Sequence, residues 1–446
     1  MNDTIYALAT APGRAAVAVL RLSGPAAGAA LAAVAGTVPR PRRAALRALR
    51  DGDGGLIDKG LVLWFPGPAS YTGEDCAELH VHGGQAVIDR FTEILAGRGL
   101  RLAAPGEFTR RAFENGKMQL DQAEAVADLI DAQSVAQARQ AIGQLGGALG
   151  RRHETWRAGL LRILADLAAA VDFADEEIPA EVASRARAPI EALLLELDSA
   201  VADAARGQRI REGYRIAVIG AANSGKSSLF NALLERDAAI VTPVPGATRD
   251  VIEAPLVLAG YQVLIADMAG IRATTDPVEI EGVRRALAWA RGAALRVWVV
   301  DGSSREGDWR LAADLVGPDD ICLINKTDLR AGEDAREAEK AAYGLGLRPL
   351  HGSLATGDAE ALRRALEARV TADLAGAEFP AATRARHASL LSEVRADLGR
   401  ALGALGEPEL AAEDVRRAAR ALARVTGRIG AEDVLDLVFA NFCIGK

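Results

Sequence analysis

Apolar residues follow two different spacings along this chain. Short continuous apolar runs at 214–219, 263–266 and 321–324 are typical of strands buried on both faces. The segment 228–234, after the first run, is predicted to begin a helix. This alternation of strands and helices predicts an α/β domain with a largely parallel sheet, which we assign to 211–370.

Helical spacing dominates on both sides of that region. Apolar residues return every three or four positions in 119–144, in 388–422 and in two further sets: Leu160, Leu164, Leu167 and Val171, and Ile190, Leu194, Leu197 and Val201. Two helical blocks that flank a domain of different character indicate an insertion, with the helices packed as one bundle and the other domain projecting from it. We expect the helical domain to consist of 119–210 and 371–446.

The N-terminal block, 1–118, contains the shorter spacing of β-strands, with strands predicted at 16–22, 61–65 and 77–81. Alternation along the last strand gives two faces: Cys76, Glu78, His80 and His82 on one, and Ala77, Leu79 and Val81 on the other. The polar face is expected to border a small-molecule pocket or solvent. A zinc site is the less favoured alternative, because adjacent residues of one strand rarely supply three ligands at tetrahedral angles.

The segment GAANSGKS at 220–227 fits the phosphate-binding pattern G-x-x-x-x-G-K-[ST], with a strand before it and a helix after it. Its glycines let backbone N–H groups surround phosphate oxygens at a helix N-terminus, where the helix dipole also favours an anion. Lys226 is expected to act on the terminal phosphates and Ser227 to bind Mg²⁺. The residues expected to contact the nucleotide here are Asn223, Ser224, Gly225, Lys226, Ser227 and Ser228.

The base is specified by NKTD, which begins with Asn325 and Lys326 and follows the third strand. The carboxylate of Asp328 can accept hydrogen bonds from N1–H and the exocyclic amine of guanine, whereas adenine presents an acceptor there. The nucleotide is therefore predicted to be GTP. A weaker match to the last loop on the guanine side consists of Ser353, Leu354 and Ala355.

Two further motifs belong to the metal and γ-phosphate side of the site. DMAG follows the second strand and places Asp267 at Mg²⁺, through water, and the Gly270 amide at the γ-phosphate. Thr248, in the loop GATRD, is the candidate second Mg²⁺ ligand. Four motifs in this order on a β/α pattern predict a Ras-like GTP hydrolase.

The residue that activates water differs from the glutamine of Ras, because Ile271 follows DMAG. The carboxylates of Asp276, Glu279 and Glu281 are candidates that could act through one water. Any one of them taken alone is better explained as a solvated charge at the start of a helix.

Composition narrows the class of protein. A chain of 446 residues predicts about three domains. Its net charge of −7 argues against the broad basic surface of a protein that grips nucleic acid unaided, so an RNA substrate would need help from a partner. No apolar run reaches the ~18 residues of a membrane span and the N-terminus has no signal-peptide order, so a cytosolic location is expected. The wide spacing of Cys76, Cys322 and Cys443 supports neither a disulfide framework nor a paired-cysteine zinc site.

Lysine is rare, because most basic residues are arginine. The six lysines are Lys59, Lys117, Lys226, Lys326, Lys340 and Lys446. Two of them lie in the GTPase motifs, which suggests that lysine is kept where a compact ammonium is required. Lys117 and Lys446 are therefore functional candidates, while chance placement is accepted for Lys59 and Lys340.

Several segments outside the GTPase motifs carry a resemblance to a known family. They are DTIYALAT, PGRAAVAVLRLSG, YTGEDCAELHVHGG, PGEFTRRAFENGKM, QAEAVADLIDA, VDFADEEI and the terminal FCIGK. Together with the GTPase motifs they resemble the MnmE (TrmE) family of tRNA modification GTPases over nearly the whole chain. The resemblance implies a multidomain α+β and α/β fold: an N-terminal α+β domain that binds tetrahydrofolate and dimerises, a discontinuous helical bundle, and an inserted Ras-like G domain.

The resemblance also implies partners and chemistry. The family acts as a homodimer with MnmG (GidA), a partner that carries FAD and uses NADH, in a heterotetramer or larger complex that binds tRNA mainly through that partner. It adds an aminomethyl or carboxymethylaminomethyl group to carbon 5 of the wobble uridine. The one-carbon unit comes from 5-formyltetrahydrofolate or 5,10-methylenetetrahydrofolate, and hydrolysis of GTP with Mg²⁺ and K⁺ is required.

Site residues carried over from the family fall on four groups of positions. The folate contacts are Arg21, Glu78, Lys117 and Lys446, and the potassium site consists of Asn223, Thr242, Val244 and Ala247, with Thr242 also at the nucleotide. Glu279 matches the family's water-orienting carboxylate. Cys443 is implied near the folate pocket, with a nucleophilic or proton-transfer role and a buried structural thiol as equal alternatives. The chain departs from the family at Met268 and Ala247, where threonine is usual.

Two other classes of function remain as alternatives. One is a regulatory GTPase of ribosome assembly, like the Era group, which appends a basic RNA-binding module with a GxxG loop. The region after Thr371 contains 10 basic and 11 acidic residues, so it is not a basic module, although GALG at Gly403 and GRIG at Gly427 have that spacing. The other is a scaffold that uses GTP only to dimerise, which predicts no affinity for folate.

Overall fold

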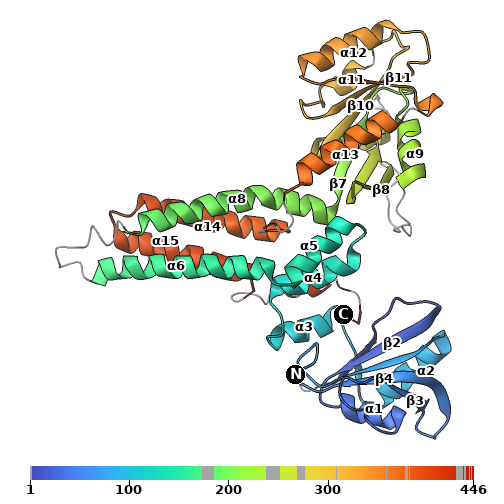
Figure 1. Cartoon of the computed structure of the whole chain (residues 1–446), viewed down its shortest axis with the longest axis vertical. Helices are drawn as coiled ribbons and strands as arrows, with labels where there is room; N and C mark the ends of the chain where they lie inside the picture. The colour runs from blue at the N-terminus through green and yellow to red at the C-terminus, as the bar shows by residue number, and fades with distance from the viewer. Residues whose placement is uncertain are drawn as a thin grey trace. The chain divides into compact units, whose positions relative to one another are not determined.

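The computed structural model describes residues 3–172, 185–237, 252–268, 277–307, 309–357, 359–376, 380, 382–427, 435, 438–440, 442 and 444–445 (Figure 1). The chain forms two compact units. The first combines Met1–Ala127, Gln144–Ile190 and Ala396–Lys446, and the second combines Asp128–Gly143 with Glu191–Arg395. Each unit therefore joins segments that are far apart in the sequence.

A six-stranded sheet forms the N-terminal part of the first unit, in the order β3-β4-β5-β2-β1-β6. Its strands are β1 (Ile5–Leu8), β2 (Ala15–Ser23), β3 (Ala45–Arg50), β4 (Leu56–Phe65), β5 (Cys76–Gly83) and β6 (Arg101–Leu102). Adjacent strands are antiparallel, except that β1 and β6 are parallel. The helices of this part are α1 (Ala27–Ala35), α2 (Gln85–Gly97) and α3 (Glu107–Glu114). The strands predicted at 16–22, 61–65 and 77–81 lie within β2, β4 and β5, and the α+β class is confirmed.

The alternation predicted for the third N-terminal strand is present in β5 from Ala77 onward, whereas Cys76, placed on the polar face by the prediction, is buried. Ala77, Leu79 and Val81 are buried in the core between the sheet and its helices. Glu78 and His80 point away from that core and are half-buried, and Glu78 stands opposite Arg21 of β2 in the strand register. Burial of alternate residues thus leaves one polar face on which charged side chains from neighbouring strands meet.

Helices make up the segments on both sides of the α/β part, as predicted. They are α4 (Leu120–Asp131), α5 (Val135–Leu145), α6 (Ala148–Asp172), α8 (Arg187–Glu212), α14 (Ala385–Gly403) and α15 (Pro408–Val425). In the first unit α6 packs along α15. In the second unit α8 runs beside α14, where Arg395 pairs with Asp198 (Figure 1).

The buried stripe of the long helices differs by one position from the prediction. In α6 the buried residues include Leu160, Ile163, Leu167 and Ala170, whereas Leu164 and Val171 are only half-buried. In α8 they include Ile190, Leu193, Leu197 and Ala200, whereas Leu194 and Val201 are half-buried. Ala170 and Ala200 were passed over because alanine buries as readily as leucine where two helices approach closely, but large residues alone had been chosen. Ile163 and Leu193 were passed over because Leu164 and Leu194, one position further on, fit a three-to-four-residue spacing equally well.

A second six-stranded sheet forms the α/β part, in the order β12-β11-β10-β7-β9-β8. Its strands are β7 (Tyr214–Ile219), β8 (Ile252–Leu258), β9 (Tyr261–Asp267), β10 (Leu295–Asp301), β11 (Ile321–Asn325) and β12 (Leu350–His351). Only the edge strand β8 is antiparallel to its neighbour. The helices are α9 (Lys226–Asp237), α10 (Pro277–Gly292), α11 (Arg310–Ala313), α12 (Glu333–Gly344) and α13 (Glu360–Leu374), with a 3-10 turn η1 (Leu354–Thr356).

Both faces of this parallel sheet are covered. Side chains of β7 alternate between two cores: Ile216 and Val218 pack with α9 and α13, and Ala217 and Ile219 pack with α10 and α12. Strands buried on both faces appear in the sequence as continuous apolar runs, which is why these runs were recognisable. The predicted α/β class of this part is confirmed.

The points where the chain enters and leaves the α/β part lie next to each other. Arg211, near the end of α8, donates a hydrogen bond of 3.0 Å from Nε to the carbonyl oxygen of Thr383. A Cβ atom on Gly207 would lie 2.5 Å from the carbonyl oxygen of Ala382, so the two segments are in close backbone contact. The hydroxyl of Tyr214 at the start of β7 donates to Asp373 at the end of α13.

No helix among the described residues is both long enough and apolar enough to span a bilayer.

Candidate functional site

The phosphate-binding loop lies between the end of β7 and the start of α9. Gly220 and Gly225 have φ angles of +150° and +107°, which side chains rarely allow. A Cβ atom on Gly225 would lie 2.1 Å from Asn325 Nδ2, so only glycine permits this approach to the NKTD segment. The helix begins at Lys226, two residues before the predicted 228, so the backbone amides of the helix N-terminus are those of the motif itself.

Lys226, Ser227 and Asp267 come together at one end of this loop. The hydroxyl of Ser227 donates to Asp267 Oδ2 at 2.6 Å, so both expected Mg²⁺-side residues are in direct contact. The ammonium of Lys226 donates to the carbonyl oxygen of Ala221 at 2.6 Å. Burial lowers the pKa of Lys226 below its ordinary value, and the nearby Asp267 carboxylate acts in the opposite direction.

The base-specifying side of the site is organised by Asn325. Its Nδ2 donates to the carbonyl oxygen of Ser224 at 2.8 Å, and its Oδ1 accepts from the amide of Leu354 at 3.1 Å. One buried side chain therefore joins the phosphate loop to the last predicted loop. Asp328, two residues beyond Lys326, is exposed to solvent as a ligand-contacting carboxylate must be.

A cavity of about 410 Å³ contains most of the residues predicted from the motifs. Its lining consists of Asn223, Gly225, Lys226, Ser227, Ser228, Asn325, Lys326, Asp328, Leu329, Leu354 and Ala355. Ser224 and Ser353 are buried beside it, and Asp267 borders it through Ser227. The structure thus brings the phosphate motif and the guanine motif to one concave surface, although they are about a hundred positions apart in the sequence.

Buried polar atoms test whether a nucleotide and its metal fit this cavity. Among the described residues, Ser224 Oγ, Asp267 Oδ1 and Ser353 Oγ are buried side-chain atoms without a hydrogen-bond partner. Leaving such atoms unpaired costs free energy, about 1 to 3 kcal/mol for a neutral group. An Mg²⁺-bound nucleotide would supply the missing partner for Asp267, and the open glycine loop leaves room for its phosphates. The residues present fit GTP and Mg²⁺.

The structure adds Asp301, a residue that the motifs did not indicate. Asp301 ends β10, and its Oδ2 pairs with Lys326 Nζ at 2.6 Å. Burial tends to raise the pKa of Asp301, but hydrogen bonds from Lys326 and Ser303 outweigh it and hold the pKa below its ordinary value. Lys326 has a φ of +62°, and this ion pair holds its side chain against the neighbouring strand.

Several predicted residues lie outside the described residues. They are Thr242, Val244, Ala247, Thr248, Gly270, Ile271, Asp276, Cys443 and Lys446, and the side chain of Glu279 is also outside them. Glu281 is described: it pairs with Arg284 and Arg285 on α10, and hydrogen bonds from these arginines lower its pKa to about 2. Met268, where the family usually has threonine, is fully buried in the core shared with α10 and α12.

A second cluster of predicted residues lies on the N-terminal sheet. Arg21 Nε donates to Glu78 Oε1 at 3.0 Å, and the Arg21 guanidinium lies 5.5 Å from the ring centre of Tyr71 and 5.9 Å from that of Phe108. Lys117 is exposed and donates from Nζ to the carbonyl oxygen of Pro68 at 2.9 Å. Arg21, which Glu78 holds, and Lys117 therefore both contact one segment, residues 67–75, which we call the 67–75 loop.

The two histidines of β5 make other contacts than the zinc alternative would require. His80 lies 3.1 Å from Glu78, and His82 lies 2.8 Å from Asp58 of β4. No group of three or more His, Cys, Asp or Glu side chains placed to hold a metal ion occurs within the described part of the chain.

A multidomain P-loop GTPase is the class of protein that this fold and the nucleotide cavity define. A family model described as "GTP-binding protein TrmE N-terminus" matches residues 4–117, and one described as "MnmE helical domain" matches residues 120–443. The chain belongs to the MnmE family of tRNA modification GTPases.

Full-length relatives are similar over the whole chain. The tRNA modification GTPase MnmE of Phenylobacterium zucineum (strain HLK1) is 58% identical over 447 residues, and that of Caulobacter vibrioides (strain ATCC 19089 / CIP 103742 / CB 15) is 59% identical over 450 residues. In both comparisons 100% of each chain is covered. This membership supports a GTPase of tRNA modification over the Era-like and scaffold alternatives.

Two solved structures are similar to part of the chain. An Aquifex aeolicus Era variant bound to GDP.AlF4- is 23% identical with a TM-score of 0.28, covering 35% of this chain and 56% of that one. The G domain of the T. maritima FeoB iron transporter is 23% identical with a TM-score of 0.27, covering 36% of this chain and 98% of that one.

Proposed function

We propose that this chain is a K⁺-stimulated GTPase that modifies tRNA together with an FAD-containing MnmG (GidA) partner, which also uses NADH. The product is a wobble uridine with an aminomethyl or carboxymethylaminomethyl group at carbon 5. The bridging carbon comes from 5-formyltetrahydrofolate or 5,10-methylenetetrahydrofolate bound to the N-terminal domain.

The folate proposal rests on one observation: Arg21, paired with Glu78, and Lys117 both contact the 67–75 loop. A pterin ring presents a row of donors and acceptors that a carboxylate such as Glu78 can bind. The glutamyl tail of a folate presents carboxylates that pair with arginine and lysine. Arg21 is held by both Glu78 and the Tyr71 ring, so little side-chain freedom would be lost when a ligand binds.

For the nucleotide, the proposal assigns Lys226 to the phosphates, Asp328 to guanine, and Ser227, Thr248 and Asp267 to Mg²⁺, the last through water. Asn223, Thr242, Val244 and Ala247 would hold K⁺, and Glu279 would orient the attacking water. When bound, the two cations supply positive charge where negative charge develops on the phosphates. For Cys443 both alternatives are kept: a nucleophilic or proton-transfer role, or a structural thiol.

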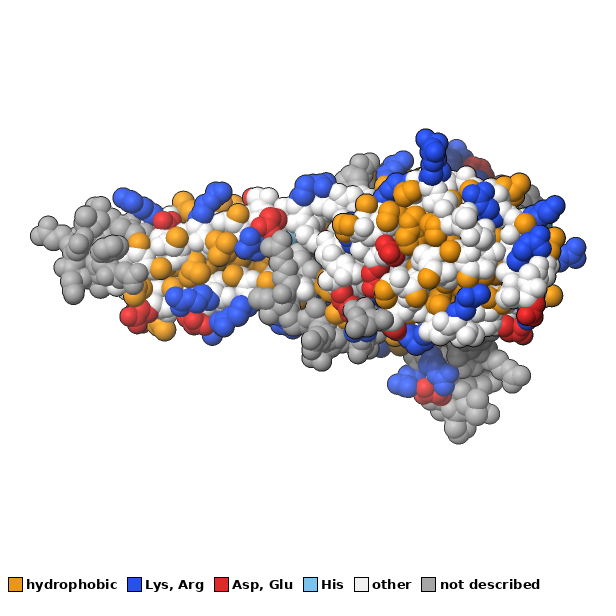
Figure 2. All heavy atoms as spheres, turned by 90° about the horizontal axis from the view of Figure 1, so that it is seen from below, with side chains coloured by type: hydrophobic (Ala, Val, Ile, Leu, Met, Phe, Trp, Pro, Cys, Tyr) orange, Lys and Arg blue, Asp and Glu red, His pale blue; other side chains and the backbone are white. Residues whose placement is uncertain are grey.

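We further propose that the chain forms a homodimer in the cytoplasm and that tRNA is bound mainly through the MnmG partner. The net charge of −7 supports the need for a partner, and Figure 2 shows basic side chains interspersed with acidic and apolar ones on the face turned to the viewer. The domain limits at 118, 210 and 370 remain part of this proposal.

Equilibrium binding of 5-formyltetrahydrofolate to the purified full chain tests the folate assignment. We expect saturable binding that Glu78→Gln weakens about tenfold or more, because a charge-assisted hydrogen bond contributes about 1.5 to 3 kcal/mol. Glu93→Gln is the matched control, since Glu93 is an exposed glutamate of the same domain that pairs with Arg90 on α2. Absence of binding to the unaltered chain would contradict the folate assignment and favour the scaffold alternative.

Deletion of Lys446 tests the proposed contribution of the C-terminus. We expect weaker binding of 5-formyltetrahydrofolate by about 1.5 to 3 kcal/mol and loss of tRNA modification, because a charged contact to the folate is removed. K⁺-stimulated GTP hydrolysis, measured in the same preparation, should be unchanged. Folate affinity equal to that of the full chain would leave the FCIGK segment with a structural role only.

A further inference from the structure

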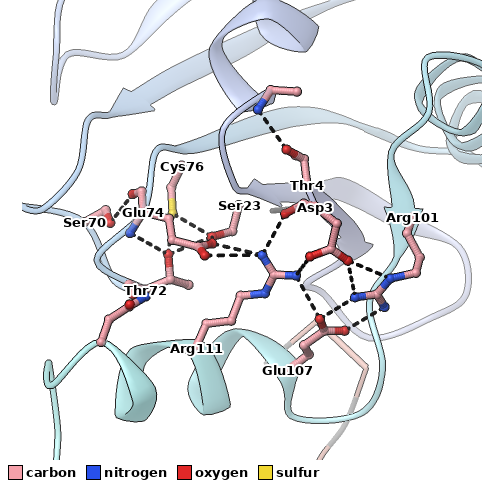
Figure 3. Close-up of polar contacts among 12 residues, drawn as sticks. Asp3, Thr4, Ser23, Ser70, Thr72, Glu74, Cys76, Arg101, Glu107 and Arg111 are labelled. Atoms are coloured by element: carbon pink, nitrogen blue, oxygen red, sulfur yellow. Dashed lines mark hydrogen bonds and ion pairs between the residues drawn. The ribbon is translucent and has the colours of Figure 1, made fainter. Parts of the chain in front are cut away.

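A fully buried arginine lies at the centre of a charged network in the N-terminal domain (Figure 3). Arg111 of α3 is 1% exposed, yet its guanidinium contacts three carboxylates. Nη2 lies 2.8 Å from Asp3 Oδ1 and 3.0 Å from Glu107 Oε1, and Nη1 lies 3.1 Å from Glu74 Oε2. Burial lowers the pKa of Arg111, but hydrogen bonds to Glu107 and Glu74 outweigh it, so this arginine stays charged.

One of the three carboxylates belongs to the 67–75 loop. Glu74 Oε2 also accepts a hydrogen bond of 2.8 Å from Ser23 at the end of β2. The Thr72 hydroxyl lies 2.7 Å from the same Ser23 hydroxyl (Figure 3). The carbonyl oxygen of Thr72 accepts a hydrogen bond of 2.7 Å from Asn115 Nδ2. The end of the loop is therefore fastened to β2 on one side and to the α3 region on the other.

The same loop contacts the basic residues of the candidate folate site. Its Tyr71 ring faces the Arg21 guanidinium at 5.5 Å, and the Tyr71 hydroxyl lies 2.8 Å from Thr109 of α3. Its Pro68 carbonyl oxygen accepts from Lys117. A displacement of the loop would therefore move the groups that orient Arg21 and Lys117 at the same time.

A charged network is a costly way to stabilise a core. Desolvation of buried charges offsets most of their mutual attraction, and well-packed apolar residues are often at least as stabilising. What ion pairs with several fixed partners do supply is geometry, because a guanidinium accepts carboxylates only in defined directions. The arrangement around Arg111 therefore fits a role in fixing the loop rather than in stability alone.

We propose that Glu74 and Arg111 are positioning residues of the folate site, which fix the 67–75 loop so that Tyr71 and the Pro68 carbonyl hold Arg21 and Lys117 in place. This inference rests on the proposed folate function. Neither residue needs to touch the ligand. Their effect passes through the loop, and it should be separable from an effect on overall stability.

Two variants test this inference, and each removes the charge of one carboxylate that pairs with Arg111. Glu74→Gln keeps the shape and the acceptor oxygen for Ser23 but removes the charge that faces Arg111 from the loop. Asp3→Asn is the matched control, because Asp3 pairs with Arg111 and Arg101, neither of which belongs to the loop. We expect Glu74→Gln to raise the dissociation constant for 5-formyltetrahydrofolate at least tenfold and Asp3→Asn to change it less than twofold. GTP hydrolysis and thermal unfolding are measured for both.

Equal weakening by the two variants would show that the network acts only through stability and would overturn the inference, as would unchanged affinity in Glu74→Gln. A second measurement separates this inference from the proposed function. Amide hydrogen exchange in the folate-free chain should become at least tenfold faster in 67–75 for Glu74→Gln and stay unchanged there for Asp3→Asn. If the unaltered chain binds no folate, the proposed folate function is wrong, and so is the proposed effect of Glu74 on folate affinity. If hydrogen exchange in 67–75 is unchanged in Glu74→Gln, Glu74 does not fix the loop, whatever the result for folate.

Discussion

Replacing Asp328 by asparagine is expected to change the base preference of this GTPase from guanine to xanthine. The exposed carboxylate at the edge of the cavity would accept two hydrogen bonds, from N1–H and the exocyclic amine of a bound guanine. Asparagine offers one acceptor and one donor, which matches the N1–H and the 2-carbonyl of xanthine. Two charge-assisted hydrogen bonds amount to about 3 to 6 kcal/mol, or roughly 10²-fold to 10⁴-fold in affinity for GTP.

Binding and hydrolysis of GTP and XTP by the unaltered chain and by Asp328→Asn measure this change. Asp314→Asn is the control, because Asp314 is an exposed aspartate of the same domain that does not line the cavity. The expected result is a loss of GTP binding together with a gain of XTP binding in Asp328→Asn alone. Retention of the full preference for GTP would show that another group reads the base.

Exchange of K⁺ for Na⁺ at constant ionic strength is expected to slow GTP hydrolysis by roughly 10² to 10³, which corresponds to loss of one electrostatic contribution of about 2.7 to 4 kcal/mol. The physical reason is that Ile271 has no group to orient water, so stabilisation of the developing charge falls to a cation beside the phosphates. Asn223 lines the cavity at the phosphate loop, where its side-chain oxygen is available to such a cation.

Asn223→Gly is the sharpest variant for this prediction. Asn223 has a φ of +60°, a conformation that glycine adopts without strain but alanine does not, so the backbone of the loop is preserved while the amide is removed. Single-turnover hydrolysis in KCl and NaCl should differ strongly for the unaltered chain and little for the variant, with Mg²⁺ held constant. Equal rates in the two salts for the unaltered chain would exclude a catalytic K⁺.

The nucleotide site could be predicted because each of its motifs is local. A glycine loop between a strand and a helix, and a polar tetrapeptide after a buried strand, are recognisable from a few neighbouring residues. Asp301 was missed because its partner, Lys326, is 25 positions away, and an aspartate after an apolar strand is common. The loop at Leu354 was a weak match because its contact with the site uses the backbone. The amide of Leu354 donates to Asn325, and the leucine side chain gives no sign of this contact in the sequence.

The N-terminal site was predictable only in part. Alternation in β5 placed Glu78 on the polar face, but neither spacing nor composition indicates that Arg21 stands opposite it. Arg111 was passed over because a single arginine on an amphipathic helix is usually solvated, and its partners Asp3 and Glu74 are 108 and 37 positions away. Long-range pairing of this kind depends on the sheet register, which the sequence pattern alone leaves undetermined.

Arg211 and Thr383, joined by their 3.0 Å hydrogen bond, also bear on how such a chain could arise. Because the α/β part departs and returns at one point, the helices α8 and α14 on either side do not have to separate to accommodate it. The free-energy cost of closing a loop grows only slowly with its length, so a large excursion between two adjacent ends is little more costly than a short one. A complete GTPase could therefore have entered an ancestral helical protein in a single genetic event, at a position where a short turn had joined two neighbouring helices.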